Sequence, residues 1–598
     1  MSKGPIPSRR RIEEIARGSA DLARSWVFKA AERLRIGDQA FHILLASTIG
    51  AAAALATGAF LSLIRLAETF FFGSLFPVMG SRNHLIFLLP ALGGLLIAPL
   101  IHFFPSETEG VGIPHAMESV ALRGGVMRLR AVALRTVAAV LTIGSGGSAG
   151  RFAPSAVLGA AVGSGVGRFL RVSGERMRSL VGCGAAAAIA AVFNAPIGGV
   201  FFALEVILGD FSAQMFAPIV ISSVAATAVS RAFIGNLLFL EGVPPIVFAG
   251  ASQIGFCGVL GAACGGAAIL FIRGLESAEG KFSSSGIPHW LRAAVGGGLT
   301  GLIAVRFPQV LGTDLATLGA AVHGNLPWLL AIWIAFLKMT ATSLSLGSGG
   351  SGGIVGPSLF IGGMIGASAG GVLSSWLPVH AGSAGGYVLV GMAAFLAPVI
   401  GAPLTAILIL FEITGDYSVI LPLLAAVMSS MLVAGRFSRF SLYTLLLHKR
   451  GIDLSGGRET GVLKKLFVRE AMQPEAHTIA PTATFAELSR RFLEDPVDYL
   501  YTTGEDGELT GVVSFTDIRP YLKEEGLSSL VLVRDIATPN PVSITPDDTL
   551  LDALDKFGYK NVSQLPEVSD PHSRKLAGVL RRKDVLEAYH KKLLSPPP

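Results

Sequence analysis

Charged residues are scarce in this 598-residue sequence, because Asp, Glu, Lys and Arg together make up only 15% of it, whereas soluble domains average about 25%. Residues 339–411 contain none of the four, and further uncharged runs cover Ser179–Leu204, Gly242–Ile272 and His84–Phe104. A helix that crosses a membrane needs about 20 apolar residues, and each run is long enough. The shortage of charge therefore excludes one large soluble domain and predicts a polytopic membrane protein.

Cysteine is also scarce: the sequence contains three, Cys183, Cys257 and Cys264, and all lie in apolar runs. Their positions exclude a disulfide framework and the ligand spacing of a metal site. The apolar region also lacks a cluster of metal ligands and a nucleophile beside a base, since its histidines are scattered: His102, His115, His323. We therefore expect no metal site, no required cofactor and no enzyme activity.

A signal-peptide core is missing too, because no apolar stretch of that type precedes Phe41. Residues 1–38 hold nine Lys or Arg against five Asp or Glu, and a basic flank before the first span favours the cytoplasm. Residues 446–598 are rich in all four charged types and are expected to form a soluble tail. Membrane orientation thus explains the net charge of +7 better than a nucleic-acid partner does, and both termini are expected in the cytoplasm.

The apolar region repeats itself. IGSGGSAGRFAPSAVLGAAVG (Ile143–Gly163) is matched 203 residues later by LGSGGSGGIVGPSLFIGGMIG (Leu346–Gly366), and Asn194–Phe211 resembles Gly401–Tyr417 in the same order. Transporters are often built from such duplications, with the substrate site between the halves. Arginine is concentrated in the first half, which suits halves that enter the membrane in opposite directions. The alternative is a duplicated scaffold without a site.

The glycine runs predict breaks in the membrane helices. Glycine is a poor helix former, whereas Pro154 and Pro357 are placed where the first turn of a helix tolerates proline. A helix that begins inside the membrane directs unpaired N–H groups and the positive end of its dipole at whatever lies before it. Each copy therefore predicts a site that binds an anion through backbone N–H groups and the helix dipole, without a charged side chain. The alternative is that the glycines only permit close helix packing.

Four motifs over residues 40–448 resemble those of the CLC family of chloride channels and proton/chloride antiporters. They are GVGIP (Gly110–Pro114), GRFAP (Gly150–Pro154), GIVGP (Gly353–Pro357) and SLYTLL (Ser441–Leu446). The resemblance implies a homodimer in the lipid bilayer, with one pathway for chloride or similar monovalent anions in each subunit. The implied anion-binding groups are the Tyr443 hydroxyl and eight backbone amides, those of Val111, Gly112, Arg151, Phe152, Ala153, Ile354, Val355 and Gly356. A bacterial inner membrane is the expected location.

The sequence departs from this family at four of its motif positions. Val111 stands where the family usually has a serine, and Val355 replaces the usual phenylalanine of the third motif. Phe152 takes the place of the gating glutamate, and Val206 that of the inner proton-accepting glutamate of the antiporters. Neither Phe152 nor Val206 can carry a proton, so a passive channel is favoured over tight coupling. Phe152 is the candidate gate, with simple packing against neighbouring helices as the alternative.

Three charged residues of the apolar region have open roles. Glu205 and Glu412 occupy equivalent places in the two copies. Carboxylates within membrane segments are functional candidates, but their duplication favours a structural role at helix ends. Arg151 follows the first glycine run, where it either adds positive potential or pairs with a carboxylate.

The tail contains a second, independent repeat. HTIAPTATFAELSRRF (His477–Phe492) is answered by VSITPDDTLLDALDKF (Val542–Phe557), and GVVSFTDI (Gly511–Ile518) by GVLRRKDV (Gly578–Val585). Each copy predicts a short strand, an amphipathic helix, a pair of strands and a closing helix.

This pattern resembles a pair of CBS domains, which implies dimerisation or binding of an adenine nucleotide. In the first copy, Ser514 and Asp517 match the pattern that holds phosphate and ribose; in the second, Asp584 matches it but Arg581 replaces the hydroxyl residue. The predicted organisation is a basic segment (1–39), a membrane domain (40–448, with repeats 40–235 and 248–448), a linker (449–463), two CBS domains (464–523 and 530–590) and a tail (591–598).

The predicted fold is therefore an all-α polytopic membrane protein with an inverted internal repeat, joined to a cytoplasmic α+β tandem CBS module. The expected function is a passive chloride channel that the CBS pair can regulate. A weakly coupled or uncoupled anion exchanger is the alternative within the family. An adenylate-sensing membrane receptor or scaffold without transport is the alternative of another class.

Overall fold

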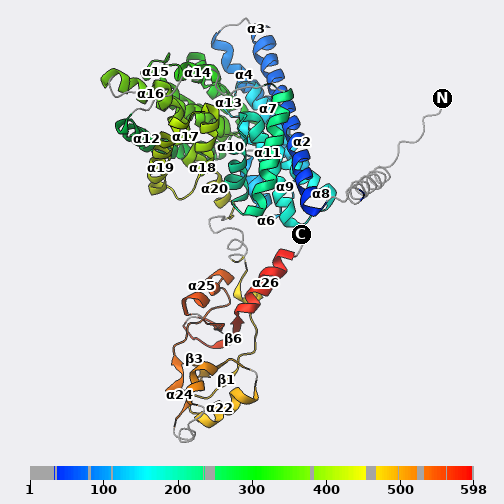
Figure 1. Cartoon of the computed structure of the whole chain (residues 1–598), viewed down its shortest axis with the longest axis vertical. Helices are drawn as coiled ribbons and strands as arrows, with labels where there is room; N and C mark the ends of the chain where they lie inside the picture. Colours follow the sequence, from blue (N-terminus) through cyan, green and yellow to red (C-terminus); the bar gives the residue numbers. More distant parts are fainter. Residues whose placement is uncertain are drawn as a thin grey trace, which may run out of the picture. The chain divides into compact units, whose positions relative to one another are not determined.

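The computed structural model describes residues 33, 37–78, 83–108, 112–233, 235, 250–377, 383–452, 463, 466–495, 497–521, 531–560, 562–570 and 572–594. The chain divides into two compact units, Met1–Gly451 and Ile452–Pro598, which Figure 1 shows in sequence colours. Most of the predicted N-terminal segment 1–39 and of the linker 449–463 lies outside the described residues.

The regular elements described in the first unit are all helices. Its first half contains α2 (Asp38–Glu68), η1 (Thr69–Leu75), α3 (Phe76–Val78), η2 (Asn83–Phe87), α4 (Leu88–Phe103), α5 (Pro105–Thr108), α6 (Ile113–Leu122), α7 (Leu129–Gly144), α8 (Phe152–Leu170), α9 (Gly174–Phe193), α10 (Pro196–Phe202), η3 (Ala203–Leu208) and α11 (Ala213–Phe233). Its second half contains α12 (Ala251–Ser284), α13 (His289–Arg306), η4 (Pro308–Val310), α14 (Leu315–Val322), α15 (Trp328–Gly347), α16 (Val355–Trp376), α17 (Ala384–Ile400), α18 (Pro403–Thr414), η6 (Tyr417–Val419), α19 (Ile420–Phe437) and α20 (Leu442–His448).

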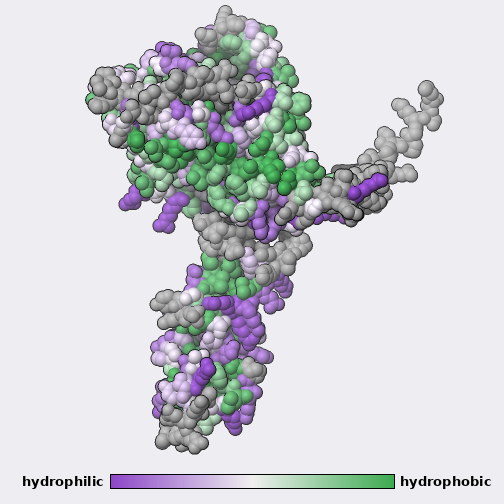
Figure 2. Space-filling view, in the orientation of Figure 1, coloured by the Kyte–Doolittle hydropathy of each residue, from purple (hydrophilic) through white to green (hydrophobic). Residues whose placement is uncertain are grey.

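Eight helical segments among the described residues are long and apolar enough to cross a membrane. Large apolar side chains point outward from them, such as Leu66 and Leu432, which are 67% and 73% exposed. Figure 2 shows the resulting broad belt of hydrophobic surface on this unit. Such a belt is stable when lipid covers it. The unit is therefore a polytopic helical membrane domain, as the charge pattern predicts.

The two halves pack their central helices in the same way. α8 lies along α9 in the first half, and α16 lies along α17 in the second. A methyl group at Gly163 would overlap the carbonyl of Leu180, and one at the equivalent Gly366 would overlap the carbonyl of Tyr387. Within these helices the glycines therefore permit close helix packing, which is the alternative that the sequence left open.

The second unit is an α+β module. Its elements are η7 (Val468–Glu470), β1 (Thr478–Ile479), α22 (Phe485–Glu494), β2 (Tyr499–Thr503), β3 (Leu509–Ser514), α23 (Phe515–Ile518), η8 (Arg519–Tyr521), α24 (Val533–Ile536), β4 (Thr538–Pro539), α25 (Leu550–Lys560), β5 (Gln564–Val568), β6 (Leu576–Arg581) and α26 (Arg582–Leu594). The described strands form one sheet in the order β1-β2-β3-β4 and a pair β5-β6. The first copy follows the predicted order of strand, helix, strand pair and helix. In the second copy the predicted first strand is reduced to a single bridge, between Ile544 and Glu567, and the helix, strand pair and closing helix follow as predicted.

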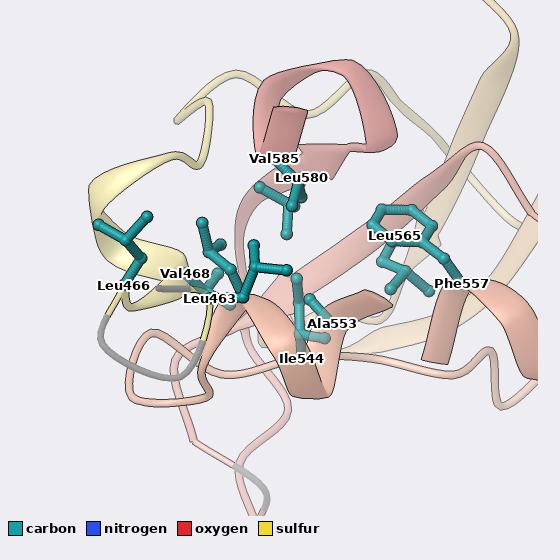
Figure 3. Close-up of a cluster of buried hydrophobic side chains, with 10 residues drawn as sticks. Leu463, Leu466, Val468, Ile544, Ala553, Phe557, Leu565, Leu580 and Val585 are labelled. Atoms are coloured by element: carbon teal, nitrogen blue, oxygen red, sulfur yellow. The ribbon is translucent and has the colours of Figure 1, made fainter. Parts of the chain in front are cut away.

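The two copies in the tail exchange their first segments, which the contiguous boundaries predicted from the sequence do not anticipate. Leu466 and Val468, at the start of the first copy, pack in the core of the second (Figure 3). Val533, at the start of the second copy, packs in the core of the first, and β4 pairs with β3. Each core is therefore completed by a segment from the start of the other copy, and the two exchanged residues Val468 and Val533 are 65 positions apart in sequence.

One buried carboxylate of the tail has no hydrogen-bond partner among the described residues. Glu567 of β5 is fully buried, and neither of its carboxylate oxygens is hydrogen-bonded. It lies opposite Gly578 of β6, as Thr502 lies opposite Gly511 in the first copy. Thr502 has a partner, since its Oγ1 is 2.9 Å from Thr510 Oγ1. Burial raises the pKa of Glu567.

Replacing Glu567 by threonine, the residue at the equivalent place in the first copy, should stabilise the tail by about 1–3 kcal/mol at pH 7. With a raised pKa, the folded state keeps a proton that the unfolded state loses above its ordinary pKa of about 4.3. The stability of the native protein is therefore highest below that value and falls as the pH rises. The gain from Glu567→Thr should grow between about pH 4 and pH 7.

Hydrogen exchange of β5 and β6 in the full-length protein measures this gain. The exposed Glu505→Thr change is the control and should leave the exchange of both strands unaltered. A stabilisation by Glu567→Thr of the same size at every pH would contradict the role of the buried charge.

Candidate functional site

The two glycine-rich motifs meet in the centre of the membrane domain. Gly150 donates its N–H to the carbonyl of Gly353 over 2.7 Å, and Gly353 donates in return to Gly150 over 2.8 Å. The bridge is antiparallel, so the two motifs run in opposite directions at this point. Residues 203 apart are thereby joined in a reciprocal pair, as an inverted repeat requires.

The turns that lead into this bridge have the same geometry in both copies. Gly146 and Gly349 adopt positive φ values of 93° and 103°, which only glycine reaches without strain. The hydroxyl-bearing residues at the ends of α7 and α15 then cross over. Ser148 N donates to Ser345 Oγ at 3.0 Å, and Ser351 N donates to Thr142 Oγ1 at 3.2 Å. These bonds fix one break against the other.

Both breaks lead directly into helix N-termini. α8 begins at Phe152 and α16 at Val355, and no side chain caps either of them. The first turns of the two helices therefore retain backbone N–H groups without intrahelical partners, which is the arrangement that binds anions. The predicted anion-binding residues placed here are buried or nearly so: Arg151, Phe152, Ala153, Ile354, Val355, Gly356.

The third predicted helix start is described only in part. Gly112 precedes α6, which has Pro114 in its first turn, whereas Val111 lies outside the described residues. α6 packs against α20, the helix of the fourth motif. Arg450, two residues after the end of α20, also contacts α6, because its Nη1 is 3.2 Å from Nε2 of His115. The structure thus brings the helix of Gly112 next to that of Tyr443.

Tyr443 itself has a hydroxyl that is available for a ligand. The residue is fully buried in the first turn of α20. Its hydroxyl has no hydrogen-bond partner among the described residues. Buried hydroxyls are normally satisfied, so this one marks a position that an anion can fill.

A second buried hydroxyl was not anticipated from the sequence. Ser358 follows Pro357 in the first turn of α16, is fully buried, and has no hydrogen-bond partner among the described residues. Its equivalent in the first copy, Ser155, instead donates to the carbonyl of Arg151 at 2.9 Å. The two serines are equivalent in sequence, so this difference between the two turns is visible only in the structure.

Phe152 is the first residue of α8 and adjoins the start of α16. It is fully buried, and its ring stacks on Phe193 at a centroid distance of 4.1 Å. Its ring edge also comes within 3.3 Å of where a Cβ on Gly356 would stand. Phe152 therefore packs against the end of α9 and at the same time adjoins the first turn of α16. The ring therefore packs against a neighbouring helix, as one interpretation from the sequence expects. It also adjoins the helix start at which the other interpretation places a gate.

The two halves of the membrane domain also bury a cation at equivalent positions, which the motifs did not reveal. Arg135 of α7 is 7% exposed and Lys338 of α15 is fully buried, and the two positions are 203 residues apart in sequence. Lys338 Nζ donates to the carbonyls of Val310 at 2.8 Å and Gly312 at 2.5 Å. The repeat offset could have identified this pair, because 203 is also the offset of the glycine motifs. Arg151, in turn, lies within electrostatic range of Glu68.

The duplicated glutamates cap helices of the opposite half. Glu412 accepts hydrogen bonds from the N–H groups of Ile197 at 2.9 Å and Gly198 at 2.6 Å, at the start of α10. Glu205 accepts from those of Leu404 at 3.2 Å and Thr405 at 2.7 Å, at the start of α18. Negative charge at a helix N-terminus is stabilising because it faces the positive end of the helix dipole. The crossed contacts support the structural role favoured from the sequence.

Removing one of these caps should destabilise the membrane domain. Glu412→Ala leaves the N–H groups of Ile197 and Gly198 at the start of α10 unpaired, of which that of Gly198 is buried, and we expect the free energy of unfolding to fall by about 1–3 kcal/mol. Thermal unfolding of the purified protein in detergent measures the loss. Glu412→Gln keeps one carbonyl acceptor and should lose less. A melting temperature unchanged by Glu412→Ala would contradict the capping role.

Val206 and two of the cysteines singled out in the sequence are buried in the membrane domain. Val206 lies buried in η3, next to Glu205. Cys183 and Cys264 are free thiols within the core. Among the described residues, no group of three or more His, Cys, Asp or Glu side chains is placed to hold a metal ion.

The predicted nucleotide residues of the tail differ in accessibility. Asp517 is exposed, and its Oδ2 accepts hydrogen bonds from the N–H and hydroxyl of Ser514, both at 2.8 Å. Asp584 is buried, and its Oδ1 accepts from Nε2 of Gln473 at 3.2 Å. Gln473 follows the exchanged residues Leu466 and Val468 and bridges Val579 of β6, so it lies against Asp584, whereas Asp517 stays exposed.

Broken membrane helices whose first turns meet between inverted repeats are the architecture of ion-transport proteins. The α+β tail with its own repeat adds a second module to that class. Comparison with known sequences then identifies the particular family. The chain belongs to the voltage gated chloride channel (CLC) family, whose pattern matches residues 93–435, and its tail contains two CBS domains, at residues 468–524 and 533–591.

Individual relatives agree with this assignment. A protein of Ralstonia nicotianae named as a ClcB-like chloride channel protein is 33% identical over 427 residues, which cover 69% of this chain and 97% of that protein. The chloride channel protein CLC-e of Arabidopsis thaliana is 29% identical over 560 residues, covering 82% of this chain and 78% of that protein.

Solved structures show the same fold. A slow cyanobacterial Cl⁻/H⁺ antiporter superposes with a TM-score of 0.62 at 22% identity, covering 68% of this chain and 97% of that one. A eukaryotic CLC transporter gives a TM-score of 0.61 at 21% identity, covering 91% of this chain and 97% of that one. The predicted fold class is therefore confirmed.

Proposed function

We propose that this protein is a passive, chloride-preferring anion channel of the CLC type that moves anions without protons. One observation carries the proposal: the two positions that would carry protons in the family's antiporters hold Phe152 and Val206, which cannot titrate. Phe152 begins α8 at the meeting point of the two motifs, and Val206 is buried in η3. Anions pass between the first turns of α8 and α16 and the Tyr443 hydroxyl.

This arrangement suits conduction more than tight binding. Backbone N–H groups and helix dipoles attract an anion with partial charges, which lets it leave again. Val111 supplies no hydroxyl, and the loss of one donor weakens the site by about 1 kcal/mol. Phe152 acts as the apolar gate, since its ring stands where the family's carboxylate would compete with the anion.

A weakly coupled exchanger is the second candidate, because several relatives are named as exchangers. The H⁺/Cl⁻ exchange transporter ClcA of Vibrio parahaemolyticus is 29% identical over 357 residues, covering 58% of this chain and 76% of that protein. Its name describes that protein, and the apolar residues at positions 152 and 206 argue against the same activity here.

Proteoliposomes distinguish these candidates. Vesicles loaded with potassium chloride are diluted into low-chloride medium with a potassium ionophore, and external chloride and pH are recorded together. A channel releases chloride with no opposing movement of protons. Proton uptake in proportion to chloride release would show exchange. No flux, combined with a stability that depends on adenine nucleotide, would support a receptor or scaffold.

The tail and the assembly complete the proposal. The chain forms a homodimer in the bacterial inner membrane, with both termini in the cytoplasm. The CBS pair binds an adenine nucleotide at Ser514 and Asp517, where Asp517 is exposed, and not at Asp584, which is buried against Gln473. Adding ATP to the tail side of the vesicles in the same assay shows whether the nucleotide changes the flux.

A further inference from the structure

A large cavity lies away from the anion pathway, between α12, α13 and α15. Its volume is about 660 Å³, which is within the usual range for a site that holds a small molecule. We call it the α12–α15 cavity. Its lining is mostly apolar and includes the aromatic residues Phe271, Phe282 and Phe336.

The cavity opens toward lipid. Its walls belong to two of the segments that can cross a membrane, Ser252–Ser284 and Trp328–Gly347. Leu270 and Phe336 line it and are 66% and 56% exposed, so the same side chains face both the cavity and the hydrocarbon around the protein. A lipid acyl chain can therefore enter from the side without crossing a polar barrier.

One end of the cavity is polar. Ser277 and Lys281 line it four residues apart on one face of α12, and Ser285, the residue that follows the last turn of that helix, lines it too. Lys281 is exposed, forms no ion pair with any described residue, and lies three residues before the end of its membrane segment (Ser284). The end of such a segment is the part expected to lie at the depth of lipid headgroups.

The acidic residues nearest to Lys281 along α12 are engaged elsewhere. Glu276 lies 3.0 Å and Glu279 3.6 Å from the ammonium group of Lys449. Arg292 holds the turn beside the cavity by donating to the carbonyls of Ile287 at 3.1 Å and Ser283 at 3.2 Å. The charge of Lys281 is thus left for a partner outside the protein, at the mouth of an ordered apolar cavity.

We propose that the α12–α15 cavity binds an anionic phospholipid. One acyl chain fills the space between Leu270, Phe336 and Phe271, and the phosphate lies against Lys281. Basic pockets between membrane helices recognise anionic headgroups in this way. Complementary charge at one end and an apolar wall open to hydrocarbon favour a phospholipid over a neutral small molecule. The inference does not depend on whether the protein is a channel or an exchanger.

Native mass spectrometry of the full-length protein tests this site. The protein is incubated with an equal mixture of phosphatidylglycerol and phosphatidylcholine, and retained lipid is counted after detergent removal. We expect preferential retention of phosphatidylglycerol. Lys281→Gln should reduce its affinity about fivefold, which corresponds to about one lysine at a membrane surface, and should leave phosphatidylcholine unchanged.

A second variant tests the cavity. A Cβ on Gly274 would meet only Ser343 Oγ, at 3.5 Å, so Gly274→Phe can fill the space without a backbone clash and should abolish retention of both lipids. Arg306→Gln is the matched control, because it removes a cation at the other end of α13.

Three results would overturn the proposal. They are equal retention of the two lipids by the native protein, equal losses with Lys281→Gln and Arg306→Gln, and retention unaffected by Gly274→Phe. A melting temperature measured for each variant shows that lipid loss does not follow from unfolding.

Discussion

Phe152→Glu is expected to slow chloride flux about ten- to thirtyfold at pH 7.5 and to make it pH-dependent. A carboxylate at the start of α8 would occupy the positive end of the helix dipole and compete with the anion. Such a charge is worth up to about 2 kcal/mol in a partly buried position, or about thirtyfold in occupancy. Protonation near the ordinary pKa of glutamate, about 4.3, removes the competitor. Flux should therefore rise as the pH falls.

The measurement is chloride release from proteoliposomes between about pH 4 and pH 8. Phe152→Gln is the control, because it has nearly the same shape as glutamate but no charge at any pH, and its flux should not vary with pH. If Phe152→Glu and the native protein conduct equally at pH 7.5, Phe152 lies outside the pathway and its stacking on Phe193 is only packing.

Gly150→Ala is expected to abolish most of the flux, by more than about tenfold, because it separates the two motifs. A Cβ on Gly150 would stand 2.9 Å from Gly356 N and 3.1 Å from the carbonyl of Gly353. These neighbours are backbone atoms that cannot turn aside. Overpacking of this kind costs about 1–3 kcal/mol, and it would weaken the reciprocal hydrogen bonds between Gly150 and Gly353 that align α8 with α16.

Flux per reconstituted protein and the melting temperature together measure this effect. Gly280→Ala is the matched control: it lies in α12 with no atom within 4 Å of its added Cβ, and it should leave the flux unchanged or add slight stability. Native flux in Gly150→Ala would show that the tight approach of the two breaks is not needed for conduction.

Several features of the fold follow directly from local patterns. The uncharged runs predict membrane helices because burial of charge in hydrocarbon is unfavourable. The glycine runs before Pro154 and Pro357 predict the breaks, and both helices begin within two residues of those prolines, at Phe152 and Val355. In the tail, alternating short strands and amphipathic helices predict the α+β module. Each of these features depends on the residues of one segment and not on the segments that pack against it.

The contacts across the repeats could be predicted only in part. The duplication of Glu205 and Glu412 favours a structural role, but not the finding that each caps a helix of the other half. Lys338 is visible in the sequence as the one cation of a long uncharged stretch, yet its bonds to the carbonyls near Gly312 are not. Likewise, nothing in the local pattern of Leu466 indicates that it completes the core of the second CBS domain.

The amino-acid sequence alone determined where this protein crosses the membrane, where its helices break, and that both halves and both tail copies repeat. Hydrophobicity and backbone propensity act over a few neighbouring residues, and these suffice for that result. Only the tertiary structure decided which groups meet: the backbone of Gly150 with that of Gly353, and the ring of Phe152 with that of Phe193. It also decided that the Tyr443 hydroxyl has no hydrogen-bond partner in the part of the chain that the structure describes. Such pairings join residues up to hundreds of positions apart, and packing selects them.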